Sequence, residues 1–220
     1  MYGCTLCVWG DYALFTRPEM KAERVSYDVM TPSAARGILE AIHWKPAIRW
    51  VVDEIWVLNE IKFSNIRRNE VKSKITDREV NQAMKTGQAI YLNASSSEER
   101  QQRAALVLKD VAYVIKAHFE LTDRAGERDN EAKHHDIFMR RARKGQCYMQ
   151  PYLGCREFPA HFRLIEVGEP DYKPIALTKD LGYMLYDLDY GHDDQPVFFR
   201  AQLEEGVLRI PEEVKKKVQL

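Results

Sequence analysis

The chain has 220 residues, and its 33 Lys and Arg are balanced by 33 Asp and Glu, so its formal net charge is zero. The 45% hydrophobic content excludes wholesale disorder and is enough for one large domain or two small domains that share a core. No apolar stretch reaches the about 18 residues of a membrane helix and no secretory signal opens the chain, so we expect a soluble cytoplasmic protein. A neutral chain can hold nucleic acid only through a local basic patch.

The N-terminal part alternates strand and helix signals. Residues 2–9 predict a strand, which a turn signal at residues 10–11 ends. A helix is expected to begin after the N-cap Thr31 and to end before Pro46, because apolar residues recur between them with helical spacing. Residues 48–61 are rich in β-forming side chains and predict either one long strand or a bent pair.

The middle of the chain is less regular. Residues 64–104 are polar and predict mobile loops, with one short helix from Asp77 to Met84. From Asp110 onward apolar and polar residues alternate, which predicts a strand with one buried and one polar face. A second helix is expected from Asn130 to Lys144, followed by Gly145 as its C-cap.

The order of these elements predicts the fold class. Strand, helix, strand, then strand and helix make up most of a ferredoxin-like (RRM-like) βαββαβ unit, so residues 1–145 are expected to form one α+β domain. Residues 146–220 contain strand segments separated by turn residues and predict an antiparallel β-sheet extension or second domain.

Four cysteines raise the question of a zinc site. Cys4 and Cys7 form a C-x-x-C, but Cys147 and Cys155 lie too far apart to complete a typical structural site. The first pair also falls in a predicted strand, where positions i and i+3 point to opposite faces. We therefore expect reduced cysteines packed as small hydrophobic residues, without a metal or another cofactor.

Lys133 and His134 at the start of the second helix are candidates for acid-base chemistry. A histidine titrates near neutrality, and a lysine supplies a fixed positive charge. Because adjacent helical residues diverge by about 100°, the two side chains meet at one site only if the first turn is exposed. The alternative is a histidine that is solvated or bonded locally.

The same helix is strongly basic. Between Lys133 and Lys144 five cations stand against one anion, which gives a local net charge of +4. A basic helix in a neutral protein predicts a track for phosphate groups. The alternative is a solvated helix end whose cations complement the helix dipole. The candidate RNA contacts on this helix are Arg140, Arg141, Arg143 and Lys144.

Two further groups carry residue types suited to RNA. His43, Trp44 and Lys45 offer a base, a stacking surface and a phosphate partner at the end of the first helix. The alternative places Trp44 in the core, with His43 as a cap. Lys116 and His118 share the polar face of the strand after Asp110, where a sheet can bind RNA or can be hydrated or covered by a helix.

Six short segments occur together in an order typical of one family. In these segments the chain resembles the fifth Cas protein family in its type I-C (Dvulg) form, a RAMP-superfamily CRISPR protein, from about residue 8 to residue 162. The resemblance implies a ferredoxin-like domain, a β-sheet extension and a metal-independent endoribonuclease. Such proteins cut CRISPR precursor RNA within its repeat hairpin and stay on the 5′ handle of the guide RNA in the type I-C surveillance complex. The segments are Gly10–Phe15, Ile42–Pro46, Lys109–Val111, Lys116–Glu120, Asn130–His134 and Leu153–Phe158.

The resemblance also implies roles for three residues. A ribose 2′-OH attacks the adjacent phosphorus, which leaves a 2′,3′-cyclic phosphate and a 5′-hydroxyl and requires a base, an acid and a cation. Lys133 and His134 match the family's Lys-His pair, whereas His43 stands where other members carry a tyrosine. The hypothesis is His43 as general base, His134 as general acid and Lys133 as phosphate stabiliser, with the acid and base roles exchangeable.

The chain departs from many members of the superfamily in its expected RNA contacts, and two alternative functions stay open. The chain lacks an obvious glycine-rich loop, so Arg67 and Arg68 are expected to join the basic helix in contacting phosphates. One alternative is a non-catalytic subunit that caps the guide RNA in the same complex. The other is a metal-dependent nuclease that uses the acidic residues of 187–194, although these are expected to be loop residues. The isolated chain is expected to be a monomer.

Overall fold

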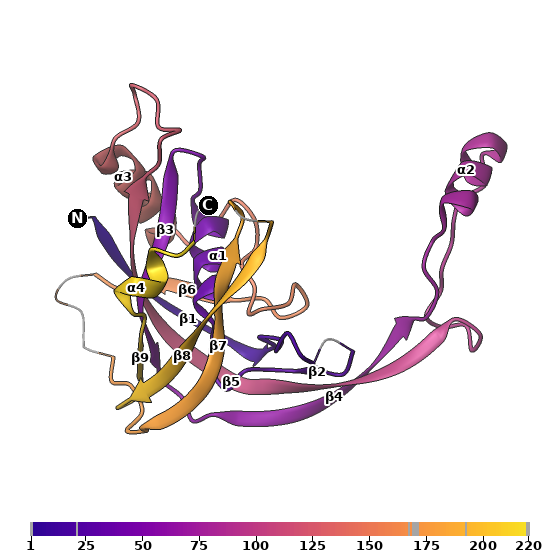
Figure 1. The fold of residues 1–220 in the computed structure, drawn as a ribbon, viewed down its shortest axis with the longest axis horizontal. Coiled ribbons are helices and arrows are strands. Elements are labelled where there is room, and N and C mark those ends of the chain that lie inside the picture. The colour runs from indigo at the N-terminus through magenta and orange to yellow at the C-terminus, as the bar shows by residue number, and fades with distance from the viewer. Residues whose placement is uncertain (1, 21, 167, 169–171, 192, 219–220) are drawn as a thin grey trace.

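The computed structural model describes residues 2–20, 22–166, 168, 172–191 and 193–218. Within these residues the strands form one sheet in the order β6-β1-β5-β3-β9-β8-β7, and β2 and β4 pair with β5 beside this path (Figure 1). The pairings are antiparallel except that of β2 with β5, so the chain is α+β with a large antiparallel sheet. The elements are β1 (Gly3–Ala13), β2 (Arg24–Val25), α1 (Pro32–Ile42), β3 (Ile48–Val57), β4 (Lys62–Val71), α2 (Asp77–Thr86), β5 (Arg100–Leu121), α3 (Glu131–Arg143), β6 (His161–Leu164), β7 (Lys179–Asp189), β8 (Gln195–Glu204), β9 (Val207–Arg209) and α4 (Glu212–Lys215).

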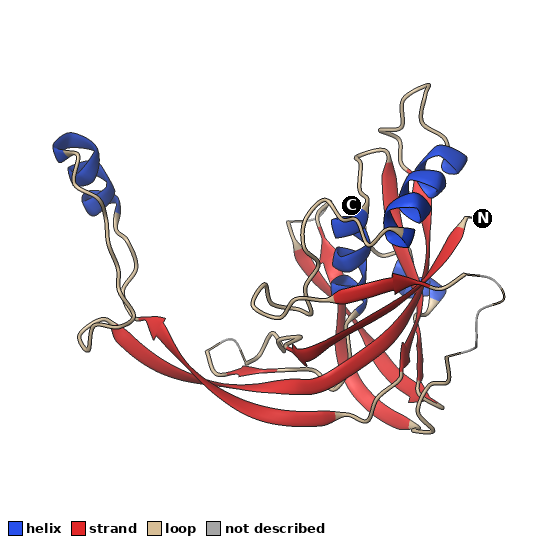
Figure 2. Ribbon diagram, turned by 180° about the vertical axis from the view of Figure 1, so that it is seen from behind, coloured by secondary structure: helices blue, strands red, loops and turns tan. Residues whose placement is uncertain are grey.

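The two longer helices of the body pack together and against the sheet. Helix α1 contacts β3 and β7, and α3 contacts β6 and α1 (Figure 2). Their apolar faces join the buried side of the strands in one hydrophobic core, which includes Ile38, Ile115 and Phe138. This packing brings the end of α1 next to α3, although some 90 residues separate them in the sequence.

The prediction of the first helix is confirmed. The Thr31 side chain accepts a hydrogen bond from the Ala34 N–H, and Pro32 occupies the first turn. The helix ends at Ile42, because its C-cap His43 is already extended, with φ −153° and ψ 119°. Pro46 therefore follows the end of the helix rather than causing it.

The predicted turn at residues 10–11 is wrong. Strand β1 continues to Ala13, and Gly10 and Tyr12 pair with Val111 and Lys109 of β5. Pairing with a long central strand outweighs the local preference of Gly-Asp for a turn. Gly10 is needed for close packing instead, since a Cβ there would lie 2.6 Å from a side-chain carbon of Leu153.

The expectation of mobile loops over residues 64–104 is wrong for residues 64–71 and 100–104, which lie in strands β4 and β5, whereas residues 72–76 and 87–99 are loops and turns. Strand β4 pairs along its length with the first part of β5, and the two form an arm that extends from the body and carries α2 at its far end (Figure 1). The predicted helix at Asp77 is present and is capped by Thr76 and Glu79. The sequence did not predict these strands, because β4 has no buried residue on either face and shows no hydrophobic alternation.

Three other predicted elements are present with shifted bounds. Residues 48–57 form one strand, with an irregularity between Val52 and Glu54 rather than a bent pair. Strand β5 begins at Arg100, earlier than the alternation indicates. Helix α3 begins after its N-cap Asn130, as predicted, and ends at Arg143.

Candidate active site

The end of α1 is fixed by hydrogen bonds from two distant elements. The indole N–H of Trp50 donates to the carbonyl oxygen of His43 at 2.9 Å. The guanidinium of Arg141, on α3, donates to the carbonyl oxygen of Ile42 at 2.7 Å. These contacts occupy backbone oxygens that the last helical turn leaves free. They hold the His43 side chain against α3.

A continuous chain of hydrogen bonds joins the three residues that the sequence singled out. His43 Nε2 lies 3.1 Å from His134 Nδ1, and the two imidazole rings are nearly parallel, with their centroids 5.4 Å apart. His134 Nε2 lies 3.2 Å from Oδ1 of Asp129. Lys133 Nζ donates to the same oxygen at 2.8 Å. The structure therefore brings Lys133 and His134 together at Asp129 and places His43 on the other ring nitrogen of His134.

Asp129 is the residue of this cluster that the sequence analysis missed. It lies in the turn before α3, so two adjacent helical residues that diverge can both reach it. The hydrogen bond from Lys133, then one from the Gly126 N–H, lowers the pKa of Asp129 to about 2. The carboxylate is therefore ionised at neutral pH. An acidic residue four positions before a lysine and five before a histidine was the available signal.

Burial sets the protonation state of His43. Both imidazoles are only 1% exposed. Burial, with added repulsion from His134, Arg141 and Lys45, lowers the pKa of His43 to about 4. His43 is therefore neutral at pH 7.

The hydrogen bonds also fix where the protons lie. Because ionised Asp129 only accepts, His134 carries its proton on Nε2, and its Nδ1 is an acceptor when the ring is neutral. His43 must then donate from Nε2. Its Nδ1 is a buried acceptor without a hydrogen-bond partner among the described residues. The pair thus holds one free basic nitrogen in a water-excluded position.

The predicted RNA contacts near this cluster differ in exposure. Trp44 is 52% exposed, so the alternative that placed it in the core is wrong, and Lys45 is also exposed. On α3, Arg140 and Lys144 are exposed. Arg143 is exposed too but pairs with a glutamate at 2.7 Å, whereas Arg141 turns inward to α1.

The two arginines of the arm lie elsewhere. Arg67 on β4 is exposed, whereas Arg68 pairs with Glu157 and lies over the ring of Phe158, 4.8 Å from its centroid. Arg68 therefore ties the arm to the segment Leu153–Phe158, one of the six segments that carry the family resemblance.

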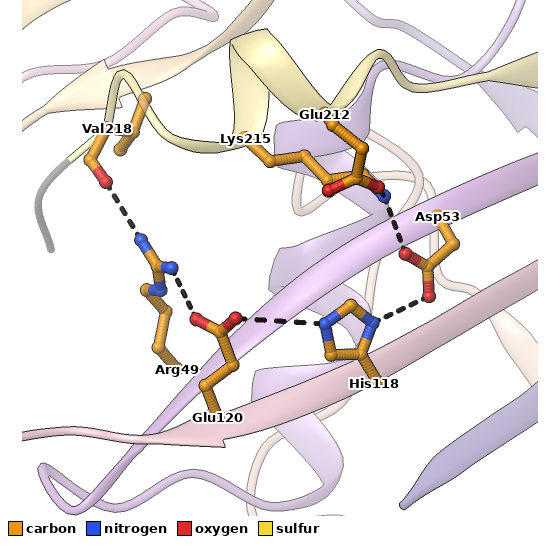
Figure 3. Close-up of polar contacts among 7 residues, drawn as sticks. All are labelled: Arg49, Asp53, His118, Glu120, Glu212, Lys215 and Val218. Carbon is orange, nitrogen blue, oxygen red and sulfur yellow. Dashed lines mark hydrogen bonds and ion pairs between the residues drawn. The ribbon is translucent and has the colours of Figure 1, made fainter. Parts of the chain in front are cut away.

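The polar face of β5 is largely engaged within the chain. Lys116 Nζ lies 3.9 Å from the centroid of the Trp56 ring. His118 is 8% exposed, and its Nδ1 lies 2.8 Å from Asp53, whose other oxygen accepts from Lys215 at 2.7 Å. Figure 3 shows this network closed by Glu120 and Arg49 beneath the C-terminal segment. Of the alternatives for this face, coverage by a helix is the one observed at His118.

The cysteines and the acidic segment take no part in the cluster. Cys4 and Cys7 are buried in β1. Asp187 and Asp189 lie in β7 and are buried, so the expectation of loop residues is wrong for them, whereas Asp193 and Asp194 do lie in the turn before β8. Asp187 accepts hydrogen bonds from both Nε and Nη2 of Arg36. Among the described residues, no group of three or more His, Cys, Asp or Glu is arranged to hold a metal ion. In the same part of the chain, no helix is long and apolar enough to cross a membrane.

Comparison with known proteins identifies the family. A family model described as Cas_Cas5d, CRISPR-associated protein (Cas_Cas5), matches residues 4–211. A Mannheimia succiniciproducens protein named CRISPR pre-crRNA endoribonuclease Cas5d is 55% identical over 219 residues, 96% of this chain and 97% of that one. A Thermus thermophilus protein of the same name is 41% identical over 225 residues, 94% and 90% of the two chains. A solved structure of a CRISPR-associated protein shares the fold, with a TM-score of 0.70 at 24% identity over 99% of this chain and 95% of that one.

These matches and the fold define a CRISPR-associated protein. The chain belongs to the Cas5d family. The resemblance carried by the six short sequence segments is thereby confirmed.

Proposed function

We propose that the chain is an endoribonuclease that cuts CRISPR precursor RNA within its repeat hairpin. After cutting, it stays on the 5′ handle of the guide RNA as a subunit of the type I-C surveillance complex in the cytoplasm. The names of the two relatives support this activity. The observation that carries it here is the convergence of His134 Nε2 and Lys133 Nζ on one anionic oxygen of Asp129.

That oxygen marks the place of the scissile phosphate in our proposal. A cationic amine and an imidazole that share one carboxylate oxygen can share one phosphate oxygen in the same way. RNA binding displaces Asp129, which is exposed enough to leave, and uncovers the otherwise buried His134. Lys133 then stabilises the charge that develops on the phosphorane.

The two histidines move the protons of the reaction. The 2′-OH loses its proton to the base as its oxygen bonds to phosphorus, and the 5′-oxygen takes a proton from the acid as its bond to phosphorus breaks. We assign His43 as base and His134 as acid. The lowered pKa of His43 supports this choice, because a base must be unprotonated at neutral pH. The hydrogen bond between the rings makes the two roles exchangeable.

We also propose that residues 1–145 form a ferredoxin-like domain and that residues 146–220 form a β-sheet extension. The order β6-β1-β5-β3 supports a ferredoxin-like sheet, because it is the 4-1-3-2 order of a βαββαβ unit with α1 and α3 as its helices. Residues 1–145 supply three of its four strands and both helices, and β6 (His161–Leu164) adds the fourth strand from beyond residue 145. The pairing of β9 with β3 supports a shared sheet. The proposed phosphate contacts are the exposed cations Lys45, Arg67, Arg140, Arg143 and Lys144.

One observation favours a second function. Both histidines are 1% exposed in the chain without RNA, as expected for a non-catalytic subunit that only caps the guide RNA. The two functions share the fold and differ in whether RNA opens the cluster.

Cleavage in excess EDTA separates these functions. Wild-type protein is mixed with its repeat RNA beside the variants His134→Ala and His135→Ala. His135 is the matched control, since it lies against the Tyr2 ring and outside the hydrogen-bond chain. We expect cleavage by wild type and His135→Ala but not by His134→Ala. Binding without cleavage by wild type favours the capping subunit, and cleavage that EDTA abolishes favours a metal-dependent nuclease.

A further inference from the structure

A pocket of about 280 Å³ lies where α1 ends. Its walls come from the end of α1, the start of β3, the loop after β5 and the end of β7. Its volume is close to the lower limit of small-molecule pockets, about 300 Å³. The lining residues that carry its chemistry are Trp44, Tyr190, Arg124, Glu40, Thr122 and Asp123.

Two aromatic side chains in this pocket are half exposed. Trp44 is 52% exposed and Tyr190 is 53% exposed, and they come from segments far apart in the sequence. Aromatic faces left open to water beside a cavity are the surfaces on which unstacked bases bind, with about 1–3 kcal/mol per stacked base. The pocket therefore fits a flat ring better than a compact ion.

The charged side chains of the pocket also favour a base over a phosphate group. Arg36 is held by Asp187 and by Glu40, at 2.6 Å each, so its charge is already neutralised. Arg49 is likewise bound to Glu120. Carboxylates of Glu40 and Asp123 line the cavity and disfavour a phosphate inside it. Carboxylates accept hydrogen bonds from the exocyclic amino groups of bases.

The position of the pocket links it to the proposed active site. Trp44 follows His43 directly. Residues 122–124 begin the loop that ends with Asp129, so the wall of the pocket and the carboxylate on Lys133 belong to one segment. Arg124 is exposed and makes no ion pair with the described residues, which leaves it available to the phosphate of a nucleotide seated here.

We propose that this pocket binds one unstacked RNA base bearing an exocyclic amino group, against Trp44 and Tyr190, and so positions the nucleotide next to the cut site. The identity of the ligand as RNA rests on the proposed function. Cytosine, adenine and guanine carry such an amino group and uracil does not, so the pocket discriminates against uracil.

A binding experiment with single missing bases tests the pocket. Repeat RNA with 2′-fluoro riboses cannot be cut by 2′-OH attack, so its Kd is measurable, and each unpaired position is made abasic in turn. We expect one position at which the missing base weakens binding to wild type by about 5- to 150-fold. Uracil at that position still stacks but lacks the amino group, so it weakens binding by a smaller factor than the missing base. In the double variant Trp44→Ala, Tyr190→Ala the same abasic change costs less than about twofold.

A matched control is the double variant Trp9→Ala, Tyr183→Ala. Both side chains are exposed, at 40% and 71%, and neither lines the pocket. This control keeps the full abasic penalty if the proposal holds. The proposal is overturned if no position shows a penalty, or if the penalty persists without Trp44 and Tyr190.

Cleavage of unmodified RNA in EDTA separates this proposal from the proposed function. If the wild type does not cut the RNA but loses affinity for it when the base is missing, and this loss depends on Trp44 and Tyr190, the base pocket is supported and the nuclease activity is contradicted. Cutting by the wild type, without any such penalty, supports the nuclease and removes the pocket.

Discussion

His43 should make the stability of the chain depend on pH. The pKa of this histidine falls from its ordinary value of 6.5 to about 4 on folding, chiefly because the ring is buried and secondarily because His134 and nearby cations repel a further charge. Between these two pH values the unfolded chain binds a proton at His43 that the folded chain does not bind. The free energy of unfolding therefore rises with pH through this window. The contribution of His43 to it is fully present above pH 6.5 and is lost as the pH falls towards 4.

The magnitude follows from the two pKa values. Each unit between them corresponds to about 1.4 kcal/mol, so the full contribution is about 3 kcal/mol. That is a large part of the 5–15 kcal/mol typical of a folded domain. In the variant His43→Gln the side-chain amide can still donate to His134 Nδ1, but it does not titrate.

Urea unfolding at several pH values from 4 to 7.5 measures the effect. We expect the variant to be less stable than the wild type at pH 7.5, with a pH dependence that is weaker by about 3 kcal/mol over the window. His161→Gln is the control, because His161 is exposed on β6. If the variant His43→Gln loses as much stability as the wild type when the pH is lowered from 7.5 to 4, His43 is not the titrating group.

Further predictions concern Asp129, two glycines and the exposed cations at the end of α3. Asp129→Ala should tighten RNA binding in a Kd measurement at low salt, because Lys133 and the buried imidazole lose their internal anion; weaker binding would contradict the proposal that Asp129 occupies the place of the scissile phosphate. Gly154→Ala should lower the free energy of unfolding by at least about 2 kcal/mol in urea, because φ is +84° and a Cβ would lie 2.1 Å from a backbone oxygen. Gly37→Ala, in a helix with open space around it, should be stabilising, and equal effects of the two changes would refute this. Charge reversal at Arg140 and Lys144 should weaken RNA binding and its salt dependence without moving the cut position; an unchanged Kd would remove α3 from the phosphate track.

The sequence predicted those elements whose signals are local. Thr31 and Pro32 mark the start of α1 because an N-cap acts within one turn of the chain. The arm could not be found in this way, since β4 has no fully buried residue and its sequence shows no hydrophobic alternation. The continuation of β1 past Gly10 was also hidden, because it depends on pairing with β5, a hundred residues away.

In the candidate active site, too, the sequence revealed local signals but not contacts between distant segments. Lys133 and His134 stand out by residue type and by resemblance, and the structure brings them to His43. Asp129 was missed although its spacing to Lys133 and His134 was a local signal. The role of Arg141 could not be assigned, because it comes from a carbonyl oxygen that the side chain meets across the fold. His118 shares a strand face with Lys116 as predicted, yet its engagement depends on a C-terminal helix whose docking no local pattern reveals.

The most direct test of the central claim uses one changed atom in the substrate. Repeat RNA and the same RNA with a single 2′-deoxy nucleotide at the cut site are incubated with the wild-type chain in excess EDTA. We expect both RNAs to bind, only the all-ribose RNA to be cut, and its products to carry a 2′,3′-cyclic phosphate and a 5′-hydroxyl. Cleavage of the 2′-deoxy RNA at the same position would contradict attack by the 2′-OH and with it the roles given to His43, His134 and Lys133.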